Sequence, residues 1–253
     1  MRVVVTGAAG KIGREIADEL ADSHELTLID CEPLPGKSSL MMDLSEYPLR
    51  ADSQLSSYSS LAEERKWRKA FDGVEVVIHL AEDPEPRTAH QRVLKNNVQA
   101  TWNVLHAAVH HRVRRVIYAS SGWAVKLLEE QLAPACYTES GRKITSEIPP
   151  CPKNPYGIGK AFGELTGKCY SDTGQLESFL AVRLGWFDPN CPKDELYNHL
   201  KITAKDLRSL FRRCVEVPFT GFHVIYGVSA QKTAPYDLFH TRRLLSWEPS
   251  SLT

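Results

Sequence analysis

The chain of 253 residues has no excess of charge of either sign and no apolar run that approaches membrane-spanning length. Lysine plus arginine and aspartate plus glutamate number 31 each, so the net charge is zero with neutral histidine. Without a net field there is no electrostatic argument for nucleic acid or an anionic membrane as a partner. Partners must be inferred from individual sites.

Cysteine is scarce and scattered: six cysteines form no C-x-x-C pair. A chain of this size needs no disulfides to hold its core, so reduced thiols are expected. No spacing of histidine and cysteine is typical of zinc, and the adjacent His110 and His111 diverge on any regular helix, so we expect no metal. The chain opens on a strand rather than a charged and then apolar leader, which predicts a cytoplasmic protein.

A glycine-rich turn near the start of the chain is the strongest motif present. An apolar strand runs into Gly7, Gly10 and Gly13, and a helix follows. This pattern lets the chain turn tightly, lets the backbone approach a pyrophosphate, and lets the helix pack on the strand. The next strand ends at Asp30, 23 residues after Gly7, where a dinucleotide-binding protein places an acid for the adenosine ribose. The motif predicts a bound dinucleotide.

Short β-branched runs alternate with amphipathic stretches, which predicts an α/β fold with a doubly wound parallel sheet. The expected strands are residues 2–6, 25–29, 75–79, 115–119 and 180–184, and the expected helices are 11–22, 60–71, 88–110 and 156–173. Residues 53–60 and 149–155 are expected to be loops. After residue 184 the pattern weakens to a helix over 203–214 and a short strand over 223–226.

The length predicts a single domain over residues 1–253. Within it we expect residues 1–175 to form mainly the dinucleotide-binding core. Residues 186–253 would then supply mainly a small substrate-binding subdomain.

Three polar residues predict proton chemistry at the carboxyl edge of the sheet. Tyr156 and Lys160 are spaced i, i+4 at the start of a helix, so the ammonium can lower the pKa of the phenol and favour a tyrosinate base. Ser121 ends a strand at the edge where open parallel sheets bind ligands. Taken singly, each motif has an ordinary structural explanation. Tyr156 and Lys160 could lie on a solvated helix face, and Ser121 could only hydrogen-bond the backbone of a loop.

Together the motifs resemble an extended short-chain dehydrogenase/reductase of the NAD-dependent epimerase/dehydratase superfamily. The matching segments are Thr6 to Gly13, Asp30, His79-Leu80-Ala81, Asn97 to Thr101, Ser120-Ser121 and Pro155 to Lys160. Within that superfamily the end of the chain is similar to uronate dehydrogenases, in residues 181–185, 225–230 and 245–249.

The resemblance implies that Tyr156 is the general base. It also implies that Lys160 binds the nicotinamide ribose and that Ser121 orients the substrate hydroxyl. It implies that NAD is held by Gly7, Ala9, Gly10, Lys11, Ile12, Gly13, Asp30, Asp43, Leu44, Leu80, Ala81, Asn97, Ala119, Tyr156 and Lys160. The carboxylate of Asp30 would repel the 2′-phosphate of NADP and so select NAD. Asp43 has an equally acceptable alternative as a solvated loop aspartate.

The residues expected at the substrate are Ser121, Gly122, Trp123, Trp186 and Lys193. Uronate dehydrogenases usually carry asparagine directly after the catalytic serine, and a serine and an arginine for the sugar carboxylate in the later loop. This chain has glycine, tryptophan and lysine there, and a carboxylate prefers a bidentate cation, so a uronate pocket is not indicated. Residues 127–146 form an unexpectedly long stretch that would act as a lid or reshape the pocket.

Three functions remain open at this point. The first is an NAD-dependent dehydrogenase that oxidises a uronate, an aldose or a sugar phosphate, with the anomeric hydroxyl as the site that would give a lactone. The second is a nucleotide-sugar epimerase or dehydratase that retains its NAD, and the third is a non-catalytic NAD-sensing protein. The resemblance also implies a homodimer through the helices at 88–110 and after Tyr156, although their apolar residues could equally face the chain's own core.

Overall fold

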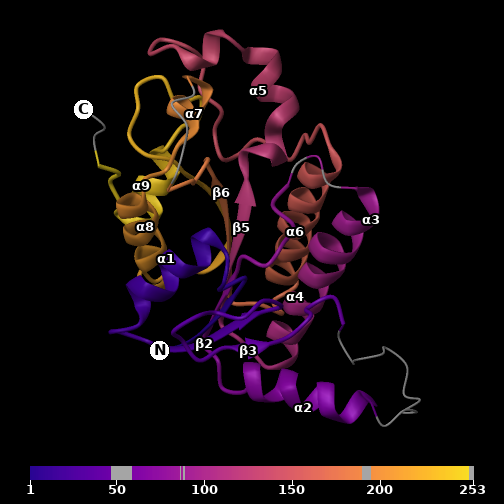
Figure 1. Ribbon diagram of the computed structural model, residues 1–253. Helices are drawn as coiled ribbons and strands as arrows, with labels where there is room; N and C mark the ends of the chain where they lie inside the picture. The colour runs from indigo at the N-terminus through magenta and orange to yellow at the C-terminus, as the bar shows by residue number, and fades with distance from the viewer. Residues whose placement is uncertain (47–58, 86, 88, 190–194, 251–253) are drawn as a thin grey trace.

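The chain folds around a seven-stranded parallel sheet with the strand order β3-β2-β1-β4-β5-β6-β7 (Figure 1). The computed structural model describes residues 1–46, 59–85, 87, 89–189 and 195–250. The strands are β1 Arg2–Thr6, β2 Glu25–Asp30, β3 Leu40–Met41, β4 Val76–His79, β5 Arg115–Ser121, β6 Ser178–Leu184 and β7 Gly221–Gly227. The strand order reverses between β1 and β4, and ligands bind at such a switch point in open α/β sheets. The prediction of a doubly wound parallel sheet is confirmed.

One face of the sheet is covered by α1 (Lys11–Leu20), α8 (Ala204–Glu216) and α9 (Phe239–Leu245). The apolar residues of α1 recur at helical spacing, and Ile16, Ala17 and Leu20 are fully buried against the strands. On α8, the buried Leu210 and Phe211 belong to the same cluster. Helix α8 therefore ties the last third of the chain to the first helix.

The opposite face is covered by α2 (Ser59–Phe71), α4 (Ala100–His110) and α6 (Pro155–Asp172). The predicted helix over 88–110 is a continuous helical segment of three parts: α3 (His90–Val93), a π-helical stretch η1 (Leu94–Gln99) and α4. Such π-helical stretches are frequent at functional sites. The sequence pattern gave no sign of this change in winding.

The last third of the chain is more regular than its sequence pattern indicated. The strand expected at 223–226 extends over Gly221–Gly227, pairs with β6 along its full length and completes the main sheet. The structure adds helix α7 (Glu195–Leu200) and α9, neither of which was predicted. Of the loop expected at 53–60, Ser59 and Ser60 begin α2, and the rest lies outside the described residues.

The long stretch after Ser121 folds into η2 (Gly122–Val125), α5 (Lys126–Leu132) and η3 (Ala135–Tyr137). Figure 1 shows α5 beyond the carboxyl ends of the strands. The segment then joins the C-terminal region, because Ile144 bonds through its backbone to Pro235 and Asp237. A separate apolar cluster of Val125, Ile144, Tyr226, Val228, Ala234, Tyr236 and Leu238 lies beneath it.

None of the described helices is long and apolar enough to cross a bilayer. Within the same residues, no cluster of histidine, cysteine or carboxylate side chains has the makings of a metal site. The described cysteines, Cys31, Cys136, Cys151, Cys169 and Cys214, are free thiols.

Candidate active site

The glycine-rich turn leaves β1 at Gly7 and enters α1 after Gly10. Gly7 has a φ of +69°, and a Cβ there would lie 2.7 Å from the backbone nitrogen of Ala81. A Cβ on Gly13 would lie 2.2 Å from the carbonyl oxygen of Gly7, so only glycine lets the helix approach the turn. Gly10 is the N-cap of α1 and has no side chain to cap it, so first-turn N–H groups, including those of Lys11 and Ile12, are available to an anion. The turn fits a dinucleotide pyrophosphate.

The carboxylate of Asp30 lies at the end of β2, beside the turn. Its Oδ2 accepts a hydrogen bond from the N–H of Ala9 at 2.8 Å, and its Oδ1 accepts one from the N–H of Glu32 at 3.0 Å. The N–H of Ala9 is therefore used within the protein rather than presented to a phosphate. Each carboxylate oxygen keeps a further lone pair that can accept from a ribose hydroxyl.

Asp43 and Leu44 lie further out along the same edge. Asp43 pairs with Lys95 at 3.0 Å and accepts from both the N–H and the hydroxyl of Ser45. Burial acts to raise the pKa of Asp43, but the bonds from Ser45 and Lys95 outweigh it and hold the pKa below its usual value. Leu44 is buried, and its carbonyl accepts from Asn103 on α4. Asp43 is thus a half-exposed loop aspartate with a surface lysine partner, and its part in cofactor binding stays a prediction.

The turn after β4 is fixed by a hydroxyl on β1. The Thr6 hydroxyl accepts from the N–H groups of Leu80 and Ala81 and contacts Nδ1 of His79 at 2.7 Å. His79 also contacts Thr101 through Nε2, and burial lowers the pKa of His79 to about 3. The imidazole is thus a neutral link between the sheet and α4, and the Thr6 hydroxyl holds Leu80 and Ala81 beside Gly7.

The structure brings Ser121, Tyr156 and Lys160 together at the carboxyl edge of β5. Asn154 caps α6 by accepting from the N–H of Gly157, with Pro155 in the first turn, so the helix begins where Tyr156 and Lys160 project toward the strand end. Ser121 and Lys160 both lie close enough to the Tyr156 phenol to lower its pKa. The Lys160 ammonium lies 5.4 Å from the centre of the Tyr156 ring.

The ionisation of Tyr156 is governed by opposing influences. Burial is the largest and raises its pKa; the charge of Lys160 and the hydrogen bonds of Ser121 and Lys160 lower it, and the charge of Glu82 raises it. The pKa of Tyr156 ends above that of an ordinary tyrosine. The predicted lowering by Lys160 is present but is outweighed by burial.

Lys160 is almost fully buried, at 4% exposure, and binds two groups at the sheet edge. It donates to the carbonyl of Ala119 at 2.5 Å and pairs with Glu82 at 2.6 Å. Burial acts to lower the pKa of Lys160, but the charges of Glu82 and Tyr156 raise it above its usual value. The ammonium therefore stays protonated.

Asn97 lies on the π-helical stretch η1 and is fully buried. Its Oδ1 accepts from the N–H of Asp83 and its Nδ2 donates to the carbonyl of Asp83. Its amide therefore secures the loop after β4, and its part in cofactor binding stays a prediction.

The position after Ser121 is glycine because another side chain occupies the space. A Cβ on Gly122 would lie 2.1 Å from the hydroxyl oxygen of Tyr236. That hydroxyl donates to the buried carboxylate of Glu129 on α5, which also accepts from Tyr137 and Lys126. Helix α5 therefore fixes Tyr236 against Gly122, and a role of the long stretch as a lid or in shaping a substrate pocket stays a prediction.

The remaining residues expected at the substrate are spread around this edge. Trp123 meets the Tyr156 ring edge-on at 6.5 Å, and Trp186 is 43% exposed on the loop after β6. Lys193 lies outside the described residues. Lys11, expected at the cofactor, forms an exposed ion pair with Asp188 at 2.9 Å, which links the glycine-rich turn to the loop after β6.

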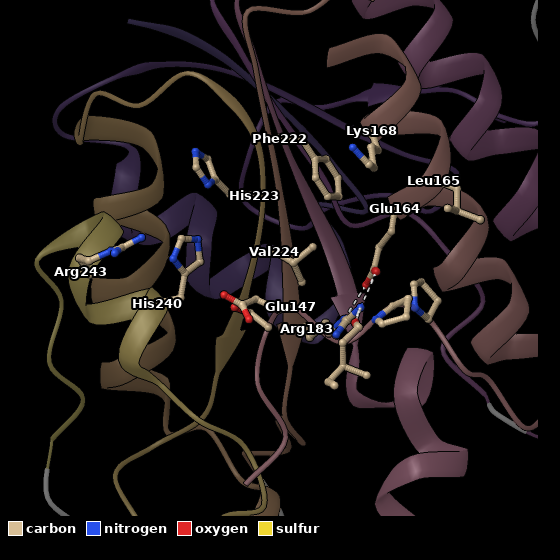
Figure 2. Close-up of a pocket in the computed structure, with 14 residues that line it drawn as sticks. Glu147, Glu164, Leu165, Lys168, Arg183, Phe222, His223, Val224, His240 and Arg243 are labelled. Atoms are coloured by element: carbon tan, nitrogen blue, oxygen red, sulfur yellow. Dashed lines mark hydrogen bonds and ion pairs between the residues drawn. The ribbon is translucent and has the colours of Figure 1, made fainter. Parts of the chain in front are cut away.

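A cavity of about 430 Å³ lies elsewhere, over β7 and between α6 and α9 (Figure 2). Its floor holds the ion pair of Arg183 with Glu164, and His223, His240 and Arg243 lie on one side. None of the three predicted catalytic side chains lines it.

Sequence reasoning missed Glu82, Tyr118, Glu129 and Tyr236. Glu82 carried a usable signal, since it is an acid three residues after the end of the fully buried strand β4 at the ligand-binding edge. Tyr236 carried none, because its place beside Gly122 depends on a contact between distant segments.

Comparison with known proteins identifies the family of this chain. Residues 3–187 match the model of the NAD dependent epimerase/dehydratase family. The chain is 31% identical over 251 residues to an NAD-dependent glucose-6-phosphate dehydrogenase of Haloferax volcanii, covering 98% of this chain and 92% of that protein. It is 30% identical to an L-arabinose 1-dehydrogenase (NAD(P)(+)) of the same organism, covering 98% and 96% of the two chains.

The fold is also that of solved sugar dehydrogenases. The crystal structure of uronate dehydrogenase from Agrobacterium tumefaciens superposes with a TM-score of 0.78 at 25% identity, covering 99% of this chain and 84% of that one. The predicted resemblance, an enzymatic function and NAD as the cofactor are confirmed by these matches. The chain belongs to the NAD dependent epimerase/dehydratase family.

Proposed function

We propose that this protein is an NAD-dependent dehydrogenase that oxidises a hydroxyl of a small sugar or sugar derivative. The observation that carries the proposal is the convergence of Ser121, Tyr156 and Lys160 at the end of β5, across the sheet edge from the glycine-rich turn. Relatives named as sugar dehydrogenases, similar over nearly the whole chain, support a sugar as the substrate class.

In the proposed reaction, Ser121 hydrogen-bonds the substrate hydroxyl and Tyr156, as tyrosinate, removes its proton. Lys160 stays protonated and stabilises the tyrosinate. Bound NAD supplies the acceptor for the hydride that leaves the same carbon. The protein's part is to position the carbon and to take up one proton.

The anomeric carbon is the proposed site of oxidation, with a lactone as the product. Uronates, neutral aldoses and sugar phosphates are the candidate substrates. Gly122 and Tyr236 fill the place where a uronate enzyme would carry asparagine, which disfavours a uronate.

Initial rates with NAD and with NADP against uronates, neutral aldoses and sugar phosphates test the proposal. Net NADH formation that tracks sugar consumption supports it. Tightly retained NAD with interconversion of nucleotide sugars and no net NADH would indicate an epimerase instead. NAD binding without turnover of any sugar would indicate a sensor.

Asp30→Asn is expected to raise the ratio of kcat/KM with NADP to that with NAD by about a hundredfold, because a carboxylate beside a 2′-phosphate costs on the order of 3 kcal/mol. Asparagine keeps an acceptor for the N–H of Ala9. The measurement is the steady-state rate with each cofactor at a fixed sugar concentration. Glu32→Gln, an exposed neighbour, should leave the ratio unchanged. An unchanged ratio in Asp30→Asn would remove Asp30 from cofactor selection.

We also propose that the protein is a homodimer through η1, α4 and α6. Leu94, Trp102, Ile158 and Leu165 are large apolar side chains between 46% and 60% exposed on these adjacent elements. The Trp102 ring lies 6.2 Å from Phe162 of α6, so the residues form a shared surface. Exposed apolar surfaces of this kind mark interaction sites.

Leu165→Glu is expected to halve the molecular mass measured by light scattering, because a charge buried at a two-fold interface has no partner. Leu127→Glu, on the exposed face of α5, is the control and should leave the mass unchanged. A monomeric wild-type protein would contradict the proposal.

A further inference from the structure

Glu82 is a buried carboxylate beside Lys160 that the proposed reaction does not use. It lies in the loop after β4, and its side chain is only 3% exposed. A carboxylate that is removed from water needs a charged or hydrogen-bonding partner.

Glu82 has a partner on each oxygen. Oε2 pairs with the Lys160 ammonium at 2.6 Å, and Oε1 accepts from the hydroxyl of the fully buried Tyr118 on β5 at 2.5 Å. Lys160 also donates to Ala119, the neighbour of Tyr118 on the same strand. Glu82 and β5 therefore hold the ammonium from two sides.

The negative charge of Glu82 also acts on Tyr156. It opposes Lys160, whose positive charge favours the tyrosinate. Burial raises the pKa of Glu82, while Lys160 and Tyr118 act to lower it. A carboxylate at this position disfavours the tyrosinate form of Tyr156 and holds the Lys160 ammonium in one place.

The other titratable groups packed around Glu82, Lys160 and Tyr156 are neutral or paired elsewhere, so they do not replace Glu82 as the partner of Lys160. They are His79 on β4, Asp83 beside Glu82, Arg92 on α3, and Glu164 on α6 with its partner Arg183. His79 is neutral, Asp83 pairs with Arg92 at 2.7 Å, and Glu164 pairs with Arg183 at 2.8 Å.

We propose that Glu82 is a positioning residue of the active site: it fixes the Lys160 ammonium and moves the pH dependence of proton removal by Tyr156 to higher pH. This inference rests on the proposed function, since it concerns the same base. It adds Glu82 to the three catalytic residues predicted from the sequence.

Glu82→Gln tests the proposal, because the amide keeps the shape of the side chain and removes its charge. The acidic limb of the plot of log kcat/KM against pH is expected to move down by about one pH unit, since a like charge near an acid disfavours its ionisation. Glu82→Asp retains the charge and should keep the limb close to that of the wild type. Glu85→Gln changes an exposed carboxylate in the same loop and should have no effect.

A second measurement does not depend on turnover. The ultraviolet absorbance of tyrosinate is titrated in the protein without added cofactor, and subtraction of the Tyr156→Phe titration isolates Tyr156. In the Glu82→Gln background this titration should shift in the same direction. If Glu82→Gln does not fold, Glu82→Ser replaces it with the same expected shift.

An acidic limb and a tyrosinate titration that both stay in place in Glu82→Gln would overturn the proposal. So would a loss of activity of equal size at every pH, since that is what a merely structural role predicts. If the wild-type protein oxidises no sugar, the proposed function fails, and the tyrosinate titration still decides the role of Glu82.

Discussion

Tyr156→Phe is expected to lower kcat for sugar oxidation by about a thousandfold, because it removes the group proposed to accept the substrate proton. The affinity for NAD should stay within about twofold of the wild type, since the phenol contributes little binding relative to the glycine-rich turn and Asp30. The ring keeps its edge-on contact with Trp123, so the site keeps its shape. Steady-state kinetics and a direct titration of NAD by calorimetry measure the two quantities.

Tyr170→Phe is the matched control. Tyr170 lies on the same helix and packs with Trp102, so the variant removes a phenol hydroxyl away from the site. Its kcat should equal that of the wild type. Equal activity in Tyr156→Phe would refute the assignment of the base.

Gly13→Ala is expected to reduce the free energy of unfolding by about 3 kcal/mol, because the new methyl group would overlap the backbone of the turn. The Cβ would lie 2.2 Å from the carbonyl oxygen of Gly7 and 2.7 Å from the Cα of Ala8, and backbone atoms cannot rotate aside. For a chain of this length, such a loss lowers Tm by roughly 10 °C. Thermal unfolding followed by circular dichroism measures it.

Gly10→Ala separates folding from binding at the same turn. Its Cβ would meet only the carbonyl oxygen of Gly7, at 3.2 Å, so Tm should change little. The methyl group stands where a pyrophosphate would approach, and the affinity for NAD should fall. If Gly10→Ala and Gly13→Ala lose the same amount of Tm, the two glycines do not have the distinct roles assigned to them.

The cofactor side of the site could be predicted from sequence because its parts are local. Gly7, Gly10 and Gly13 occupy one turn, and Asp30 ends the strand that pairs with the strand before that turn. Tyr156 and Lys160 are four residues apart on one helix, so their common direction follows from helical geometry. The position of Ser121 next to them follows from the rule that ligands bind at the carboxyl ends of parallel strands.

The surroundings of Gly122, on the proposed substrate side, could not be predicted because their contacts join distant segments. The hydroxyl of Tyr236 lies against Gly122 although the two residues are more than a hundred positions apart in the sequence. Glu129 holds this hydroxyl in place from α5, a helix that the sequence pattern did not predict. Strand β7 was underestimated because its first residues are only partly buried at the edge of the sheet, which weakens the apolar pattern.

The position of β7 and α8 bears on how substrate preference could be exchanged between relatives. In a chimaera joined near residue 175, β5 and β6 would come from different parents, and so would α1 and α8. The strand pairing and the helix packing between the two parents would then have to be compatible. Residues 122–151 enter and leave the fold at the same sheet edge, where Cys151 bonds back to Ala124. Recombination that transfers this segment together with Tyr236 would replace the surroundings of Ser121 and Gly122 and leave the sheet intact.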